Sequence, residues 1–562
     1  MATPDWAAVS KRSDSLILSG APYELRNAVV NGTTQRVYAH AARSLNDIYR
    51  RALTMGEAVL AADGETTLSY REAFRRAARL RAAFRDRLGV RAGSRVGIAL
   101  GNSLEYIVSF LAVTSLGATA VQFGVKDIRT ISRDAGMLGC TLLICDRLFA
   151  SALRSGSIPL VVAESSGSPP IGQPDVYDMA RLIAESEHSK AGAEELPSLP
   201  GEEEVMIAFT SGTTGPPKGV VITQLGMVTG LTNMLLSNAL AAVTRGQTLP
   251  GADRSGGPPC ALLVSPLAHV SGYSQLLLTL MLGGKLILAP SWNVQTVSRV
   301  IDRQKVRSLA GANIAQLSEL LEYREEAGPL KSIGINGTAL YPGLQGDLSR
   351  RWPTVVLATG YGLTETNGSI STIAGLALWS EPQCVGKVVP SVEIKVTTTD
   401  GRPLQAGTTG EVWLQGANLM SGYWQPSAPP SGLVGGWFRT GDVGSLSMDG
   451  VLSISGRIED IFFVDGKEIS APDLERVLME ELWISEAAAL PTLSNDSTGA
   501  LTVALVVKPG HSGDLGAIRR QVSARTRVPE SLVTVVPYKA LPRNSSGKLD
   551  RSFLRTQFLR GA

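Results

Sequence analysis

Apolar residues follow two alternating spacings over the first half of the chain. From Tyr70 they recur every three or four positions, which predicts an amphipathic helix. Short continuous apolar stretches then alternate with further helical stretches. This βαβ order predicts a large α/β region with parallel sheets. The expected strands are 94–100, 118–123, 141–145, 158–164, 260–266 and 285–290, and the expected helices between them include 103–117 and 273–282.

The last third of the chain has a different pattern. After Gly401, apolar stretches punctuated by glycine, such as 410–416, predict a β-rich subdomain. Further on, Ser470 and Asp473 stand at capping-box spacing before an apolar helical face that extends to Leu482. Strands at 500–508 and 532–538 and a helix at 515–526 complete a small α+β unit.

These patterns predict an α/β protein of two domains. The large N-terminal domain, residues 1–456, is expected to hold two α/β subdomains and the β-rich one. The C-terminal domain, residues 457–562, is expected to be a small α+β domain.

Composition changes this picture little. The chain has 53 basic and 50 acidic residues among 562, a net charge of +3, which gives no argument for nucleic acid as a partner. Its four cysteines and four histidines lack the spacing of a metal site or a disulfide framework. The most apolar run, 274–290, is interrupted by glycine and lysine, so we expect a cytoplasmic protein without an integral membrane segment. The oligomeric state stays open.

The stretch "TSGTTGPPKG", residues 210–219, combines glycines, hydroxyls and one lysine. Glycine lets backbone N–H groups approach a ligand, and hydroxyls and lysine add donors and charge, so phosphate oxygens suit this stretch. It is not a Walker loop, because Pro217 and Gly219 stand where the second glycine and the hydroxyl belong. A surface turn is the alternative interpretation of these residues alone.

Five more stretches follow in order, and together with the first they resemble the adenylate-forming superfamily of acyl-CoA synthetases, luciferases and adenylation domains. They are "PLAHVSG" (266–272), "GYGLTET" (360–366), "GWFRTGD" (436–442), "SGRIED" (455–460) and "PRNSSGKLDR" (542–551). Each is weak alone, and their order carries the resemblance.

The resemblance implies two half-reactions that use ATP, Mg²⁺ and coenzyme A. A carboxylate attacks the α-phosphate of ATP and releases pyrophosphate, and a thiol then attacks the acyl-adenylate and releases AMP. It also implies which residues hold the β and γ phosphates: Thr210, Ser211, Gly212, Thr213, Thr214, Gly215 and Lys218.

The stretch around "YGLTE" is expected to hold nucleotide and metal. By the resemblance Glu365 is the Mg²⁺ ligand, and a carboxylate oxygen suits that hard cation. Tyr361, between Gly360 and Gly362 of the nucleotide site, would stack on adenine, and Thr364 would lie near the α-phosphate. A solvated surface glutamate and a merely packed tyrosine are the alternatives for these residues taken alone.

The remaining nucleotide residues lie further along the chain. The resemblance assigns Asp442 to both ribose hydroxyls, for which an acceptor-only carboxylate is suited. Arg457 would bind the same ribose. Glu459, with Asp460 beside it, would be the hinge between the domains, so the resemblance implies that the C-terminal domain is mobile. Lys548 would reach the reacting carboxylate and the α-phosphate and stabilise the charge that develops there.

The acid and thiol sites are less sharply defined. His269 would stand at the mouth of the acid pocket, near the route of the thiol. Residues 267–275 lack the aspartate of amino-acid-activating domains, so an uncharged acyl group is favoured. Asn336 replaces a common glycine just before three residues assigned to the nucleotide, and Gly466 is retained for the thiol step. Those three are Gly337, Thr338 and Ala339.

The predicted activity is that of an AMP-forming carboxylic acid:CoA ligase acting on a small-molecule acid, either medium-chain aliphatic or aryl. One alternative loads the acyl group onto the phosphopantetheine of a carrier protein in trans. Another, a non-catalytic binding protein, is disfavoured by the retention of Lys218, Glu365, Asp442 and Lys548.

Overall fold

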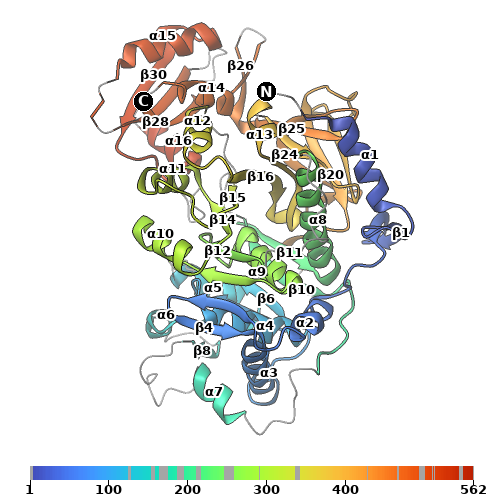
Figure 1. Ribbon diagram of the computed structural model, residues 1–562. Coiled ribbons are helices and arrows are strands. Elements are labelled where there is room, and N and C mark those ends of the chain that lie inside the picture. Colours follow the sequence, from blue (N-terminus) through green and yellow to red (C-terminus); the bar gives the residue numbers. More distant parts are fainter. Residues whose placement is uncertain are drawn as a thin grey trace.

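In the described part of the chain, six β-sheets of nine, eight, six, three, two and two strands form the bulk of the protein together with their covering helices (Figure 1). The computed structural model describes residues 4–124, 128–152, 158–163, 175–186, 195–210, 217–245, 258–289, 291–335, 342–381, 383–426, 428–464, 467–481, 483–492, 500–508, 510–511, 513–543 and 549–560. In Figure 1 the C-terminal elements (red) lie at the opposite end of the molecule from α3 (Tyr70–Asp86) and α7 (Met179–Glu185).

The first large sheet has nine strands in the order β22-β21-β11-β10-β6-β5-β7-β8-β9. Its parallel part comes from the predicted βαβ units, and the hairpin of β10 and β11 adds antiparallel strands. Helix α4 (Leu104–Ser115) is buried on nearly every side, which explains its apolar sequence. The strands are β5 (Arg95–Ala99), β6 (Thr119–Gln122), β7 (Cys140–Cys145), β8 (Leu160–Val162), β9 (Val176–Asp178), β10 (Glu204–Phe209), β11 (Gly219–Thr223), β21 (Gly422–Gln425) and β22 (Ala428–Ser431).

The second large sheet has eight strands in the order β17-β16-β15-β14-β12-β13-β3-β4. Its inner pairs are parallel and its two edge pairs are antiparallel. Its strands are β3 (Val59–Asp63), β4 (Thr66–Ser69), β12 (Cys260–Leu263), β13 (Lys285–Leu288), β14 (Ser308–Ala312), β15 (Ser332–Ile335), β16 (Val356–Leu363) and β17 (Gly368–Ala374). The helices that follow them are α9 (Val270–Leu282), α10 (Val294–Arg303), α11 (Ile314–Tyr323) and α12 (Pro342–Arg351).

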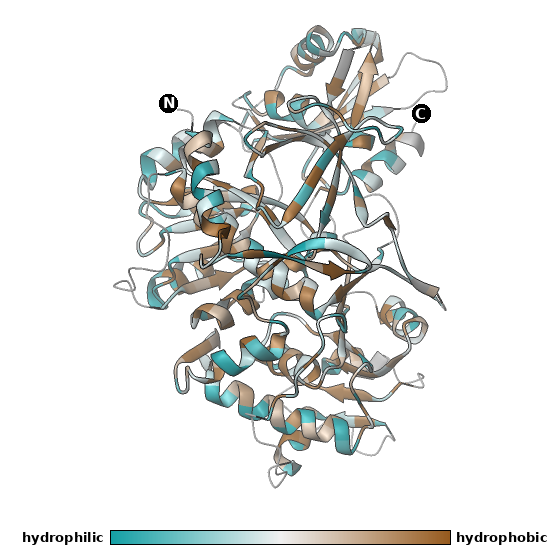
Figure 2. Cartoon of the chain, turned by 90° about the vertical axis from the view of Figure 1, so that its right-hand side faces the viewer, coloured by the Kyte–Doolittle hydropathy of each residue, from teal (hydrophilic) through white to brown (hydrophobic). Residues whose placement is uncertain are grey.

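Helix α8 (Gln224–Val243) packs against β17 in the interior. Among the described residues it is the one helix long and apolar enough to cross a membrane, and 78% of that stretch is buried inside the protein. Core helices of globular proteins have this character. Figure 2 shows apolar residues running along the strands and alternating with hydrophilic ones on the outer helices.

The predicted β-rich subdomain is a sheet in the order β18-β25-β24-β20-β19, with β23 (Leu433–Val434) paired to β24. Its strands are β18 (Cys384–Lys387), β19 (Val392–Thr397), β20 (Gly410–Gly416), β24 (Trp437–Leu446) and β25 (Val451–Arg457). The other described elements before it are α1 (Trp6–Ile17), β1 (Leu25–Val30), β2 (Thr33–Tyr38), α2 (Leu45–Leu53), α5 (Ile128–Met137), α6 (Arg147–Ala152) and α13 (Leu376–Ser380).

The C-terminal elements form a small α+β unit with its own apolar core, as predicted. A hairpin of β26 (Ile461–Val464) and β27 (Lys467–Ser470) leads into α14 (Ala471–Leu478). The rest comprises β28 (Ile484–Thr492), β29 (Ala500–Val507), α15 (Leu515–Thr526), β30 (Val533–Tyr538) and α16 (Arg551–Arg560). The proposed boundary between residues 456 and 457 falls at the end of β25 and stays a prediction.

Helix α14 differs in detail from its prediction. It ends at Leu478, four residues before the expected Leu482, which lies outside the described residues. Ser470 caps the helix as expected, since its hydroxyl accepts from the backbone N–H of Asp473 at 3.3 Å. The Asp473 carboxylate accepts instead from Gln383 Nε2 at 2.7 Å, and so links the helix to the start of β18.

Candidate active site

The predicted phosphate loop joins the two antiparallel strands β10 and β11. The backbone N–H of Thr210 donates to the carbonyl of Lys218, and the N–H of Lys218 donates to the Thr210 hydroxyl, both at 3.0 Å. A Walker loop joins a strand to a helix, so the hairpin topology agrees with the rejection of that motif. Residues 211–216 between these ends, which include Ser211, Gly212, Thr213, Thr214 and Gly215, lie outside the described part of the chain.

The Lys218 side chain lies at the exposed end of this hairpin. Its Nζ is 4.8 Å from the centroid of the Tyr423 ring, a cation–π contact. Tyr423 belongs to β21, which pairs with β11 directly after the lysine. The loop lysine therefore contacts a residue 205 positions further along the chain.

Glu365 sits in a 3₁₀ turn, η1 (Thr364–Thr366), between β16 and β17. The glutamate is only 8% exposed, and its Oε1 accepts from the Tyr423 hydroxyl at 2.6 Å. Its backbone carbonyl accepts from the N–H of Met420 at 2.9 Å. Thr364, half-buried, lies in the same turn. The structure thus fixes the predicted metal ligand through both its main chain and its side chain.

Asn367 ends this turn in the left-handed conformation, with φ of 52°. Its Nδ2 donates to the Gly226 carbonyl of α8 at 2.9 Å, and its Oδ1 accepts from the Tyr273 hydroxyl of α9 at 3.1 Å. The turn carrying Glu365 is therefore attached to two buried helices.

Gly360 and Gly362 of the predicted nucleotide site lie on β16, where that strand pairs closely with β17. A Cβ at Gly362 would lie 2.2 Å from the carbonyl oxygen of Gly368, and one at Gly360 would lie 2.7 Å from that of Ser371. Both positions need glycine so that the two strands can approach one another. This packing role exists whatever part the two glycines take in binding.

Asp442 is 5% exposed and joins two other predicted site residues. Its Oδ2 accepts from the Tyr361 hydroxyl at 2.5 Å, and its Oδ1 pairs with Arg457 Nε at 2.9 Å. Arg457 also donates from Nη1 to the Thr440 carbonyl at 2.8 Å. Three residues separated by up to 96 positions, which the sequence assigned to adenine and ribose, therefore meet in one buried cluster.

Burial and charge act against each other in this cluster. Burial raises the pKa of Asp442, while Arg457 and the Tyr361 hydroxyl hold the increase back. Burial opposes the charge on Arg457 as well, but Asp442 and Glu459 outweigh it, so the pKa of Arg457 is raised. The charge of Glu365 adds to the upward shift in the pKa of Asp442.

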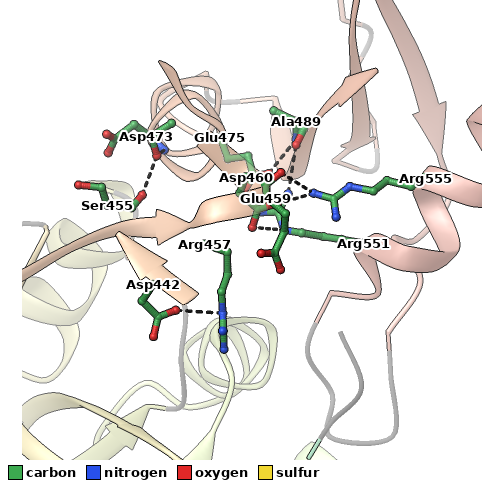
Figure 3. A network of polar contacts seen from close by, with 11 residues as sticks. Asp442, Ser455, Arg457, Glu459, Asp460, Asp473, Glu475, Ala489, Arg551 and Arg555 are labelled. Carbon is green, nitrogen blue, oxygen red and sulfur yellow. Dashed lines mark hydrogen bonds and ion pairs between the residues drawn. The ribbon is translucent and has the colours of Figure 1, made fainter. Parts of the chain in front are cut away.

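The predicted hinge residue, Glu459, is exposed in a second 3₁₀ turn, η2 (Ile458–Asp460). Its neighbour Asp460 is 5% exposed and pairs with Arg555 Nη2 at 2.7 Å and with Arg551 Nε at 3.5 Å. Figure 3 shows these two arginines reaching from α16 to Asp460 while Arg457 points the other way, to Asp442. Asp460 is thus bound to the C-terminal unit, and so is the Glu459 carbonyl, which accepts from Arg555 Nη2 at 3.0 Å, while the Glu459 side chain is exposed.

His269 takes the N-cap position of α9. Its backbone N–H donates to the carbonyl of Pro266 at 3.1 Å, and its side chain is half-buried. Its predicted place at the mouth of an acid pocket stays a prediction. So do the roles of the predicted residues outside the described part of the chain: Gly337, Thr338, Ala339, Gly466 and Lys548.

The residues present fit a divalent cation shared with a phosphate ligand. No group of three or more His, Cys, Asp or Glu side chains gathers as a metal site in the described ranges. Mg²⁺ usually binds through one or two carboxylates together with waters and substrate phosphates. The Glu365 carboxylate, close to Lys218 through their common neighbour Tyr423, supplies a donor of this kind.

Two residues around Glu365 were missed from the sequence, Tyr423 and Asn367. Tyr423 lies in "SGYWQP", whose aromatic pair after a glycine looks like an ordinary strand. Asn367 directly follows the "LTET" stretch. Asparagine tolerates the left-handed conformation, which could have indicated a turn there but not its partners.

Two curated CoA ligases are similar to this chain over most of its length. 4-coumarate-CoA ligase 2 of Narcissus pseudonarcissus is 28% identical over 486 residues, which cover 82% of each chain. The 2-succinylbenzoate–CoA ligase of Geobacillus kaustophilus (strain HTA426) is 29% identical over 522 residues, covering 91% of this chain and 97% of that one.

Solved structures show the same fold. An o-succinylbenzoate CoA synthetase of Bacillus subtilis, in complex with its acyl-adenylate intermediate, superposes with a TM-score of 0.73 at 24% identity and covers 91% of this chain and 98% of that one. An amide bond synthetase of Marinactinospora thermotolerans gives 0.75 at 24% identity, covering 92% and 99%. The model of the family described as AMP-binding enzyme matches residues 49–424, more than half of the chain. The protein therefore belongs to the AMP-binding enzyme family, within the adenylate-forming superfamily.

Proposed function

We propose that the protein activates a carboxylic acid with ATP and Mg²⁺ and transfers the acyl group to CoA, with release of AMP and pyrophosphate. One observation carries this proposal. Two buried carboxylates, Asp442 and Glu365, are joined to the same stretch of chain, because Asp442 accepts from the hydroxyl of Tyr361, four residues before Glu365. Arg457 pairs with Asp442, and Lys218 contacts the ring of the tyrosine that donates to Glu365. Carboxylates between cations suit a ligand that brings a diol, phosphates and a metal ion together.

Each residue assigned to the site has a distinct part in this reaction. Asp442 would accept from the ribose hydroxyls, since each oxygen keeps a lone pair beyond its contacts with Tyr361 and Arg457. Glu365 would hold Mg²⁺, which when bound neutralises charge on the phosphates. Lys218 would face the phosphate oxygens of the departing pyrophosphate. Lys548 would stabilise charge on the α-phosphate during attack by the acid.

For the acid itself we propose an aryl carboxylate in preference to a medium-chain aliphatic one. The two ligases most relevant here are named for 4-coumarate and 2-succinylbenzoate, both aromatic acids. The stretch 267–275 carries no acidic residue to bind a substrate ammonium group, which favours an uncharged acyl group. A cytoplasmic location remains a prediction.

Pyrophosphate exchange with a panel of acids tests both levels of the proposal. We expect exchange that depends on an added acid, with aryl acids ahead of medium-chain aliphatic acids and amino acids inactive. The best acid is then incubated with CoA or with a phosphopantetheine-bearing carrier protein, and the thioester is measured. A thioester on the carrier alone would replace CoA as the acceptor, and no acid-dependent exchange at all would refute acid activation.

A further inference from the structure

We propose that Tyr423 is a positioning residue that holds both parts of the triphosphate site, the Glu365 carboxylate with its hydroxyl and Lys218 with its ring. This inference rests on the proposed function, because it takes Glu365 as the metal ligand and Lys218 as a phosphate ligand. Tyr423 lies outside the two stretches that hold Lys218 and Glu365, residues 210–219 and 360–366, and its role is to position these two residues.

The position of Tyr423 is set by its neighbours in the nine-stranded sheet. β21 lies between β11 and β22, and Tyr423 pairs with Val220 on one side and Ser431 on the other. Gly432, with φ of +113°, leaves room for the ring, since a Cβ there would lie 2.7 Å from Tyr423 Cδ2. The tyrosine therefore stands on a strand held from both sides, next to a position that only glycine fits.

The same register brings Lys218 to the ring. Val220 is directly opposite Tyr423, and Lys218 precedes Val220 by two residues. Residues two apart on a strand share a face, and diagonal neighbours across strands are within reach of long side chains. The Nζ-to-centroid distance of 4.8 Å follows from this geometry. Lys218 is exposed, so the ring limits the directions open to a side chain that would otherwise move freely.

The hydroxyl of Tyr423 acts on the other partner. It donates to Glu365 Oε1 at 2.6 Å and leaves Oε2 for a further ligand. A carboxylate oxygen accepts in this contact, so the tyrosine hydroxyl is the donor. Hydrogen bonds of this type fix the direction of a metal-binding carboxylate.

The two contacts use separate parts of one side chain, so they can be removed separately. Tyr423→Phe deletes the hydroxyl and keeps the ring, whereas Tyr423→Leu deletes both. The matched control is Tyr177→Phe on β9, at the opposite edge of the same sheet. Equilibrium binding of ATP is measured without any acid, so that no adenylate forms, over a range of Mg²⁺ concentrations and also in a metal chelator.

For Tyr423→Phe we expect the Mg²⁺ concentration that half-saturates its effect on ATP binding to rise about tenfold. ATP binding in chelator should not change, because the ring still faces Lys218. For Tyr423→Leu we expect the same Mg²⁺ shift and, in addition, about two- to fivefold weaker ATP binding in chelator. Tyr177→Phe should leave both quantities at wild-type values.

A second background isolates the lysine contact. In Lys218→Met protein, Tyr423→Leu should no longer weaken ATP binding in chelator beyond the effect of Lys218→Met itself, while its Mg²⁺ shift should persist. A thermal unfolding curve for each variant checks that it is folded. If Tyr423→Leu is unfolded, the near-isosteric Tyr423→Phe variant still tests the inference.

The outcomes separate the inference from the function it rests on. An unchanged or lowered Mg²⁺ requirement in Tyr423→Phe overturns the inference, because the hydroxyl would then be idle or would compete with the metal. Equal loss of ATP binding in chelator for the Phe and Leu variants overturns the role of the ring. Wild-type protein that binds no ATP at any Mg²⁺ concentration overturns the proposed function as well.

Discussion

Asp442 and Asp460 are both buried aspartates paired with arginine, and they lie on either side of one short link. Asp442 pairs with Arg457, which comes from the neighbouring strand β25 of the same sheet. Asp460 pairs with Arg551 and Arg555 of α16, which follow it by 91 and 95 residues. The first pair therefore belongs to the β-rich subdomain and the second to the C-terminal unit.

The difference locates the link between the two parts of the molecule. Arg457 is held on one side, and Asp460 and the Glu459 carbonyl are held by Arg555 on the other. The chain between these contacts is Ile458 and the N-terminal part of Glu459, and both side chains are exposed. Arg551 Nη2 also pairs with Glu475 Oε2 at 2.7 Å, and Arg551 Nη1 donates to the Ala489 carbonyl (Figure 3). These contacts of one arginine join α16, α14 and β28. If the C-terminal unit moves as predicted, the rotation should be confined to residues 458–459.

The largest effect is expected from the loss of Arg551. Arg551→Met should lower the free energy of unfolding by about 3–5 kcal/mol, because it leaves Glu475 and Asp460 buried without their shared cation. Urea unfolding measures the loss, and Arg519→Met on the exposed side of α15 is the control, expected to stay within about 0.5 kcal/mol of wild type. A loss of unfolding free energy as small as that of the control would show that the contacts of Arg551 with Glu475 and Asp460 do not stabilise the protein.

Lys548 tests whether the far side of the link moves. Lys548→Ala should slow adenylation about 10²- to 10³-fold, equivalent to about 2.7–4 kcal/mol, if its ammonium stabilises charge on the α-phosphate. With chemically prepared acyl-adenylate and CoA, the same variant should form thioester near the wild-type rate. Loss of both half-reactions in folded protein would contradict the domain alternation, and Lys539→Ala serves as a control lysine in the same unit.

ATP binding distinguishes Asp442 from Asp460. Asp442→Asn keeps the shape of the side chain but removes its charge, and we expect ATP binding to weaken by about 1.5–3 kcal/mol for the lost charged hydrogen bonds. Calorimetric titration with ATP gives the value, and Asp460→Asn is the paired variant. Because Asp460 faces α16 and not the ribose site, an equal loss of ATP affinity in both variants would erase the distinction between the two aspartates.

The smallest expected effect is a pH dependence of stability in the cluster of α16. Burial raises the pKa of Glu475 above its usual range although Arg551 opposes the shift. The folded state then holds this proton more tightly than the unfolded state, so the contribution of Glu475 to stability falls as pH rises through the raised pKa. The unfolding free energy of wild type relative to Glu475→Gln should therefore increase on acidification from neutral pH, and a difference independent of pH would contradict the shift.

Periodicity made much of this fold predictable. Helix α4 was recognisable because a buried helix is apolar on all sides, and α3 because one face alone is apolar. The end of α14 was placed too late because Leu482 continues the apolar pattern after the helix has stopped at Leu478. Spacing reports which face is buried, and it does not report where tertiary contacts end a helix.

The candidate site divides in the same way. Tyr361, Asp442 and Arg457 lie in separate stretches, and the resemblance named all three before the structure joined them. The role of Tyr423 could not be predicted from the sequence, because its contacts depend on the register of β21 against β11, two strands far apart in sequence. Contacts of this kind are a property of the assembled sheet.

The brevity of the link at residues 458–459 limits what a moving C-terminal unit can do. Two residues of extended chain reach at most about 7 Å, so the unit can turn on this link but cannot drift away from it. Groups carried beyond Asp460 would then remain at a local concentration on the order of millimolar or higher beside the nucleotide site, whatever the concentration of the enzyme. Each new orientation would be reached as an intramolecular search over a few dihedral angles, so dilution of the protein should leave the exchange between orientations unchanged.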